Sequence, residues 1–312
     1  YLNEQKALVK TAYNIEKTAV FYEYDQNNVA ENGYPLGVLG IEQSFEFPTV
    51  YAAQRKTANR QVELAKNEYE RAKNQLKKNV SSAYFDIVCL QCKLKKLSII
   101  DSTYEGYSKA AKQKFEAGEI SKLDLLNAQS KHSTVKMRHQ QMLRDKEMAI
   151  EAFNALLQDE NSHTVIFEPL SKIEPDLPQI ENEAGYRLTA DQVNLNKAML
   201  KVEQNKLLPD ITLGYFNGTN AYDNAQNYHG VHVGLALPLF FGSQKAKIDA
   251  ARQSQQAAMY RQNDYKIRFE YTLKSLLAEL KKYSETLQYY EETGISLSEQ
   301  IIEAATKSYE AS

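Results

Sequence analysis

The chain has 312 residues, with 38 lysine and arginine residues against 40 aspartate and glutamate residues, for a formal net charge of -2. This balance excludes the basic excess typical of nucleic-acid-binding proteins, and no long run of like charge indicates an interaction tail. With only 7 prolines, 12 glycines and no tryptophan, the composition favours long helices.

The chain starts inside what resembles the end of a helix, so its natural N-terminus is expected to lie upstream. A β-hairpin is predicted next, over residues 18–47, with turn-forming residues up to Gly33 between its halves. In the second half, Leu39–Phe47, apolar side chains alternate with the polar residues Glu42, Ser44 and Glu46. This period of two predicts a strand with one apolar and one polar face.

Residues 49–157 are predicted to form a long antiparallel helical hairpin. The stretch contains no proline, and apolar residues recur every three or four positions through both halves, which is the spacing of a coiled coil. A single helix over 49–117 would be on the order of 100 Å long. Gly118 supplies the turn between the two helices.

No metal site or cofactor is predicted. Cys89 and Cys92 lie in a helical pattern without a second pair, so we favour core or surface thiols over a zinc or redox site. His132 and His139 lie seven positions apart on one helix face, without a carboxylate at a fixed spacing. We expect them to be ordinary surface histidines.

A second hairpin is predicted over residues 209–240, followed by another proline-free helical region. In Val231–Leu237 the apolar side chains alternate with His232, Gly234 and Ala236. Two interpretations of the hairpins stay open: a transmembrane β-barrel wall that is apolar outside and small or polar inside, or a water-soluble hairpin that rests on a helix. No run approaches the roughly 20 apolar residues of a membrane-spanning helix.

The whole pattern occurs twice in the sequence. Phe47–Arg55 matches Leu237–Lys245 at an offset of 190 positions, and Ala110–Gly118 matches Ala304–Ser312 at an offset of 194. The first match places a proline at each strand–helix junction, Pro48 and Pro238. Because proline fixes φ and lacks an N–H, it ends a strand and opens a helix well.

We therefore predict a mainly α fold with β-hairpins and an internal two-fold repeat. The first repeat, 1–180, holds a helix end, the hairpin 18–47, the helical hairpin 49–157 and a linker. The second, 181–312, holds a helix, the hairpin 209–240 and a long helix that stops at the expected turn. Both ends of the chain are expected to be truncated.

This arrangement resembles the outer-membrane efflux protein family, whose best-known member is TolC, over nearly all of the chain. Three features carry the resemblance. The strand–proline–helix junctions are each followed by a glutamine, Gln54 or Gln244. Lys206–Gly214 is similar to the family's entry from helix to strand, and Phe115–Gln129 is similar to its periplasmic tip segment.

The resemblance implies a homotrimer in which each protomer supplies four strands to a twelve-stranded transmembrane β-barrel in the outer membrane. The long coiled-coil helices would form an α-barrel across the periplasm. The implied partners are a periplasmic adaptor (membrane fusion protein), an inner-membrane pump and outer-membrane lipid, and no nucleic acid. The protein would be a passive channel component of a tripartite efflux pump and not an enzyme.

The resemblance also implies roles for individual residues. Those expected at the adaptor-docking tip are Gly118, Glu119 and Ile120. Those expected at the aperture or in the lumen are Asp124, Glu42 and Glu46, with Ser44 and His232 as further lumen candidates. Cargo stays open between metal cations and drugs, and the alternative to a channel is a soluble coiled-coil scaffold or a curvature-binding protein.

Overall fold

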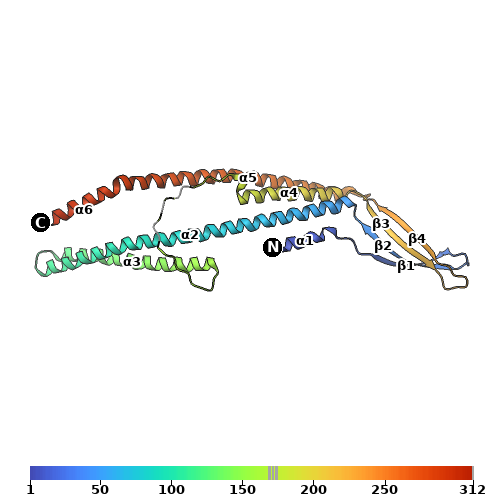
Figure 1. Ribbon diagram of the computed structural model, residues 1–312, viewed down its shortest axis with the longest axis horizontal. Coiled ribbons are helices and arrows are strands. Elements are labelled where there is room, and N and C mark those ends of the chain that lie inside the picture. Colours follow the sequence, from blue (N-terminus) through green and yellow to red (C-terminus); the bar gives the residue numbers. More distant parts are fainter. Residues whose placement is uncertain (168–169, 171, 173–174, 311–312) are drawn as a thin grey trace. The chain divides into compact units, whose positions relative to one another are not determined.

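A computed structural model describes every residue except 168–169, 171, 173–174 and 311–312 (Figure 1). The chain forms two compact units: a sheet unit of Tyr1–Tyr69 with Pro178–Ser312, and a hairpin unit of Glu70–Leu177. These units differ from the two sequence repeats, since the sheet unit draws on both halves of the chain.

Four antiparallel strands form one sheet in the order β1-β2-β3-β4. Their bounds are β1 Ala19–Val29, β2 Pro35–Phe45, β3 Asp210–Thr219 and β4 Tyr228–Ala236. The strands of each hairpin pair with each other, and β2 pairs with β3, so the two hairpins lie side by side although the sequence separates them widely. β1 and β4 are the two edges of the sheet.

The rest of the sheet unit is helical. It holds α1 Leu2–Leu8, the 3₁₀ turn η1 Val9–Tyr13, the 3₁₀ turn η2 Ile180–Asn182, α4 Ala184–Asn205, α5 Phe241–Tyr289, the π turn η3 Tyr290–Gly294 and α6 Ile295–Glu310. α4 packs along α5, and the strands project from the end where α4 stops and α5 begins (Figure 1).

The second helical region is not the single long helix that the sequence predicts. The π turn η3 separates α5 from α6, and Gly294 lies in it because a Cβ there would come 2.7 Å from the Tyr290 ring. The sequence matches on either side differ in offset, 190 and 194 positions, so this repeat has four additional residues. Four residues are close to one full turn of a regular α-helix, and the π turn, which closes i→i+5 hydrogen bonds, lies in the interval that contains them.

α2 runs from the sheet unit into the hairpin unit over Pro48–Glu116 without interruption. α3, Lys122–Leu157, follows after a short turn. Within the hairpin unit, α2 and α3 bury a cluster around Ile87, Val88 and Phe153, with Ile87 at 0% exposure. The predicted helical hairpin is thus held together by apolar side chains. Complete burial of one such side chain stabilises the fold by roughly 1.5–3 kcal/mol.

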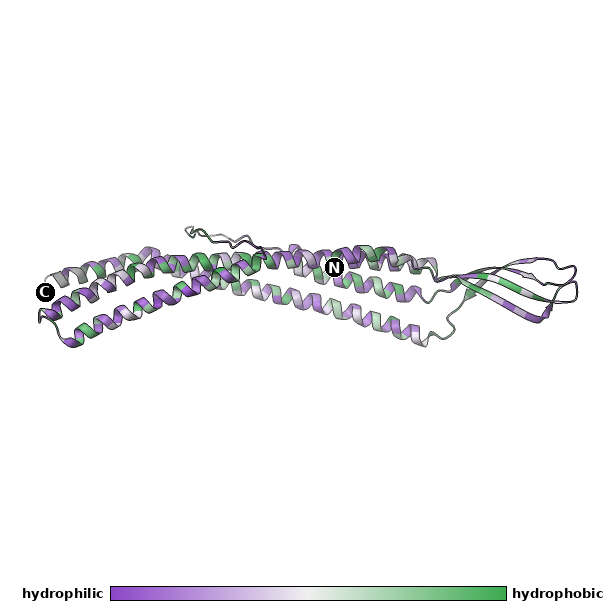
Figure 2. Ribbon diagram, turned by 90° about the horizontal axis from the view of Figure 1, so that it is seen from below, coloured by the Kyte–Doolittle hydropathy of each residue, from purple (hydrophilic) through white to green (hydrophobic). Residues whose placement is uncertain are grey.

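Apolar and polar residues alternate along the helices, as Figure 2 shows by colour. None of the helices within the described residues is apolar over a sufficient length to traverse a bilayer. The mainly helical prediction with antiparallel strands is confirmed.

Candidate functional site

The sheet has two chemically distinct faces, because strand side chains alternate. Register places one row of residues on the first face: Ala19, Glu42, Gly214 and His232. The next row on this face is Phe21, Gly40, Phe216 and Gly230. This polar face therefore alternates large side chains with glycine across neighbouring strands.

Glu42 and His232 meet across β3 on the polar face. His232 Nε2 lies 3.3 Å from Glu42 Oε2, and both side chains are 39% exposed. The strand between them passes beneath the pair at Gly214, where a Cβ would come 2.0 Å from His232 Cε1. Two predicted lumen residues are thus brought together, and a glycine makes their contact possible.

The opposite, apolar face is largely unburied. On β4 it carries Val231, Val233 and Leu235, which are 77%, 73% and 65% exposed, and on the other strands it carries Val20, Ile41, Leu213 and Tyr215. A monomeric protein in water rarely exposes such a continuous apolar surface. In a barrel wall this is the face that meets lipid.

The first strand–helix junction is locked by a local network. Pro48 is the first residue of α2. The backbone N–H of Glu46 donates to Tyr51 Oη at 3.0 Å, and Gln54 Nε2 donates to Glu46 Oε2 at 2.8 Å. Glu46 lies at the end of the polar face, and its two hydrogen bonds stabilise the junction.

The second junction has a different partner. Pro238 lies between β4 and α5, ahead of the first residue of the helix, Phe241. Gln244 Nε2 donates to the backbone carbonyl of Glu203 at 2.7 Å and to its Oε2 at 2.9 Å. The matched glutamines of the two repeats therefore bind different carboxylates: Glu46, between β2 and α2, and Glu203, on α4.

The tip of the hairpin unit is a compact turn. Gly118 has φ +81, and its N–H donates to the Phe115 carbonyl at 3.0 Å while the Glu119 N–H donates to the Lys114 carbonyl at 2.9 Å. These two bonds form a Schellman motif, which requires a left-handed residue after the helix. Gly118 therefore ends α2 as predicted.

α3 begins in a capping box. Ser121 Oγ accepts from the Asp124 N–H at 3.2 Å, and the Asp124 carboxylate accepts from the Ser121 N–H at 3.2 Å and from its hydroxyl at 2.6 Å. Ile120 packs with Leu125 in a small cluster, as a hydrophobic staple does. Asp124, an aperture candidate, has this capping role in the isolated chain.

The loops at the far end of the two hairpins are clasped to each other. Asn32 Nδ2 donates to Asn220 Oδ1 at 2.9 Å, and Asn220 Nδ2 donates to Asn32 Oδ1 at 3.1 Å. The rings of Tyr34 and Tyr222 stack at 3.9 Å between centroids and 9°. Each loop thus uses the same Asn-x-Tyr sequence, a repeat that the sequence interpretation missed although both copies are legible in it.

His132 and His139 do have a carboxylate partner, in contrast to the expectation from their spacing. Asp101 on α2 lies between them, with Oδ1 3.6 Å from His132 Nε2 and Oδ2 3.6 Å from His139 Nδ1. One turn further along α2, the pKa of Glu105 is lowered by its hydrogen bond to Lys109 and by the charge of that lysine, with smaller contributions from His132 and others. Among the described residues, no three His, Cys, Asp or Glu side chains group as metal ligands do.

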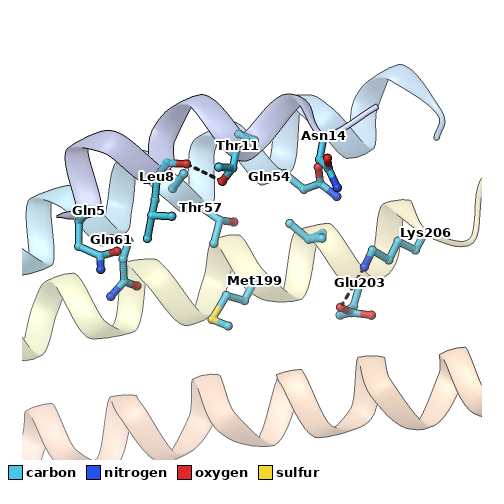
Figure 3. Close-up of a pocket in the computed structure, with 13 residues that line it drawn as sticks. Gln5, Leu8, Thr11, Asn14, Gln54, Thr57, Gln61, Met199, Glu203 and Lys206 are labelled. Atoms are coloured by element: carbon cyan, nitrogen blue, oxygen red, sulfur yellow. Dashed lines mark hydrogen bonds and ion pairs between the residues drawn. The ribbon is translucent and has the colours of Figure 1, made fainter. Parts of the chain in front are cut away.

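A hollow of about 470 Å³ lies between α1, α2 and α4 (Figure 3). Neutral side chains such as Gln5, Gln61 and Thr57 point toward it, as does Met199, and Glu203 contacts Lys206 at 3.9 Å. Apart from the paired Glu203 and Lys206, this lining offers hydrogen bonds from neutral side chains.

Comparisons with known proteins agree with this architecture. Among solved structures, the outer membrane protein VceC of Vibrio cholerae is 15% identical with a TM-score of 0.75, over 99% of this chain and 80% of that one. The Campylobacter jejuni CmeC outer membrane channel is 15% identical with a TM-score of 0.75, over 99% and 72%. A membrane protein of Pseudomonas aeruginosa is 16% identical with a TM-score of 0.77, over 99% and 78%.

At these identities the solved structures establish the fold. No curated protein sequence matches significantly. A family model described as outer membrane efflux protein matches residues 21–158 and 187–311, which together are most of the chain and include all four strands except the first residues of β1. The chain belongs to the outer membrane efflux protein family.

Proposed function

We propose that three copies of this chain close into one duct, with a twelve-stranded β-barrel in the outer membrane and an α-barrel in the periplasm. As a family member, the chain is an outer-membrane channel component for efflux. The proposal concerns how this chain builds the channel. The observation that carries it is the sheet with one exposed apolar face and one polar, glycine-rich face.

The open edges of the sheet support closure between copies. In a bilayer, the backbone groups of β1 and β4 would lack partners, at a cost of several kcal/mol for each unsatisfied group. Pairing β4 of one copy with β1 of the next removes both edges. Two copies would give an eight-stranded barrel, whose interior is just wide enough to be filled by side chains. A third copy gives twelve strands and a wider lumen.

In this barrel, Glu42 and His232 line the lumen with Ser44, whose Oγ lies 3.2 Å from Thr212 Oγ1. Val231 and Val233 face lipid. Glu42 and His232 are each 39% exposed. These polar side chains suit a water-filled passage and do not favour one cargo class. Metal cations and drugs both remain candidates.

The repeats 1–180 and 181–312 would then each contribute one β-hairpin and long helices to the duct. The duplicated Asn-x-Tyr loops support this division, because equivalent residues of the two halves contact each other. The adaptor would dock at the tip, where the turn at Gly118 places Glu119 on the surface beside the capped start of α3.

Fractionation followed by native mass spectrometry tests the proposal. We expect the protein in the detergent-extracted outer membrane, in complexes of three copies. Recovery in the soluble fraction, as a monomer or dimer, would favour the coiled-coil scaffold or curvature-binding protein instead.

A charge reversal tests the adaptor-docking tip. Glu119→Lys is expected to weaken binding of the cell's periplasmic adaptor about tenfold in a pull-down. The reversed charge would face a surface of the adaptor that suits a carboxylate, and a tenfold loss of affinity corresponds to about 1.4 kcal/mol. Glu160→Lys, three residues beyond the far end of α3, is the matched control. Equal binding by the wild type and both variants would remove Glu119 from the docking surface.

A further inference from the structure

A second hollow in the sheet unit has a strongly basic lining. It measures about 440 Å³ and lies against α2, α4 and α5. Its charged lining residues are Lys56, Arg60, Lys197 and Lys201, and amide side chains complete it at Asn194, Gln204 and Gln255. No aspartate or glutamate lines it within the described part of the chain. We call these four cations and three amides the basic pocket.

The basic pocket follows from how α2 and α4 pack. The two helices run antiparallel, because Asn205 at the end of α4 donates to the Thr49 carbonyl near the start of α2 at 3.2 Å, and Asn67 further along α2 bonds Asp191 near the start of α4. Each helix therefore presents two cations one turn apart to the same hollow: positions 56 and 60 on α2, and 197 and 201 on α4.

Small side chains make the room. Ala53 and Ala198 are 7% and 6% exposed and belong to the pocket lining. Larger residues at these two positions would fill the space between the cations. The volume lies within the range of small-molecule sites in proteins, roughly 300–1,000 Å³.

The positive charge of the basic pocket is mostly unbalanced by the protein itself. Arg60 contacts Glu63. Over the residues that the structure describes, Lys56, Lys197 and Lys201 form no ion pair with an acidic side chain. Like charges one turn apart on a helix repel each other, and an anion bound among them would relieve the repulsion.

We propose that the basic pocket binds the phosphate group of an anionic ligand. The three lysines supply point charges, and the planar guanidinium of Arg60 can hold two phosphate oxygens at once. The amides of Asn194, Gln204 and Gln255 add neutral hydrogen bonds. Two sources offer this chemistry: a phospholipid headgroup and a dissolved phosphate compound.

The position of the pocket brings both sources within reach. Lys56 follows the strand–helix junction at Pro48 by eight residues, or about 12 Å along α2. If the strands span the membrane, as the proposed function holds, this is the depth at which the headgroup layer gives way to the periplasm. Between the transmembrane helices of other membrane proteins, basic pockets near the bilayer surface bind anionic headgroups.

Binding measurements on the intact, detergent-purified protein test the inference. Two probes are used: inorganic phosphate in solution, and nanodiscs that contain phosphatidylglycerol or phosphatidylcholine. The pocket variant is Lys197→Gln with Lys201→Gln. The matched control is Lys245→Gln with Lys247→Gln, which removes the same charge from the start of α5, outside the pocket. Glutamine keeps helix propensity, so both variants should fold.

We expect the wild type and the control to bind at least one probe, and the pocket variant to bind it at least tenfold more weakly. Binding of phosphatidylglycerol but not of inorganic phosphate would identify the ligand as a phospholipid headgroup. Binding of inorganic phosphate alone would identify it as a dissolved phosphate compound. Binding of neither probe, or equal losses in both variants, would overturn the inference. Single-channel conductance of the same samples reports separately on the duct, so a duct that conducts without binding phosphate refutes only the pocket.

Discussion

At the scale of single residues, the polar face of the sheet depends on where side chains are absent. The contact between His232 and Glu42 crosses an intervening strand, which is feasible only because Gly214 has no Cβ to occupy the space. Gly40 and Gly230 play the same part beneath the rings of Phe21 and Phe216. Glycine therefore sets which large side chains fit on this face of the sheet.

Replacing Gly214 tests this dependence. In Gly214→Ala, the new methyl group would displace the His232 ring, and overpacking of this kind costs about 1–3 kcal/mol. Gly234→Ala, on the same face, is the matched control, because its Cβ would lie 3.5 Å from Thr212 Cβ in ordinary contact. We expect a lower melting temperature for Gly214→Ala only. Equal melting temperatures for the two variants would contradict this dependence, because the His232 ring could then move away from Glu42 at no cost in stability.

At the scale of elements, caps and clasps determine where helices and loops end. α2 ends in a Schellman motif and α3 starts in a capping box, so the turn at the tip is fixed by its own backbone and short polar side chains. The tip of the hairpin unit is thus shaped before any adaptor contacts it, and a docking partner would meet an ordered turn.

Ser121 is expected to contribute most of this cap. Ser121→Ala removes the hydroxyl that accepts the Asp124 N–H, and loss of such a cap costs about 0.5–2 kcal/mol. Amide hydrogen exchange in the first turn of α3 should accelerate, while exchange around the buried cluster at Ile87 stays unchanged. Uniform acceleration along the whole helix, or none at all, would contradict this local role.

The loop clasp makes a separate prediction at this scale. Because Asn32 and Asn220 each donate to the other, either substitution by alanine removes both hydrogen bonds. Each asparagine also has hydrogen bonds of its own, Asn32 to the Asp223 carbonyl and Asn220 to the Tyr34 carbonyl. The double variant Asn32→Ala with Asn220→Ala should therefore lose less stability than the sum of the two single losses, with a coupling energy of about 1–2 kcal/mol. Chemical denaturation of the four proteins measures this quantity. Strictly additive losses would mean that the amides do not act as a pair.

At the scale of the whole molecule, much of the architecture could be predicted because it depends on local rules. The period of two identifies the faces of β2 and β4, proline at position 48 opens α2, and Gly118 ends it. These features are properties of neighbouring residues. The four-residue difference between repeat offsets was also visible, yet only the backbone shows that a π turn lies in the longer interval.

The other features that could not be predicted bring together residues distant in sequence. Asp101 meets His132 and His139 only after α2 and α3 fold against each other. The pairing of Asn32 with Asn220 and the basic pocket likewise require the registers of separate elements. A single sequence shows which side chains exist, but the packing of strands and helices decides which of them converge.

The central claim is that the polar face of the sheet lines a conducting lumen while the apolar face meets lipid. Single-channel recording tests it directly, with Glu42→Cys and the neighbouring Ile41→Cys each made in a Cys89→Ser, Cys92→Ser background and treated with an anionic thiol reagent. We predict that the reagent reduces the current of Glu42→Cys, in up to three steps, and leaves Ile41→Cys unaffected. Block of Ile41→Cys with no effect on Glu42→Cys would contradict this assignment of the two faces.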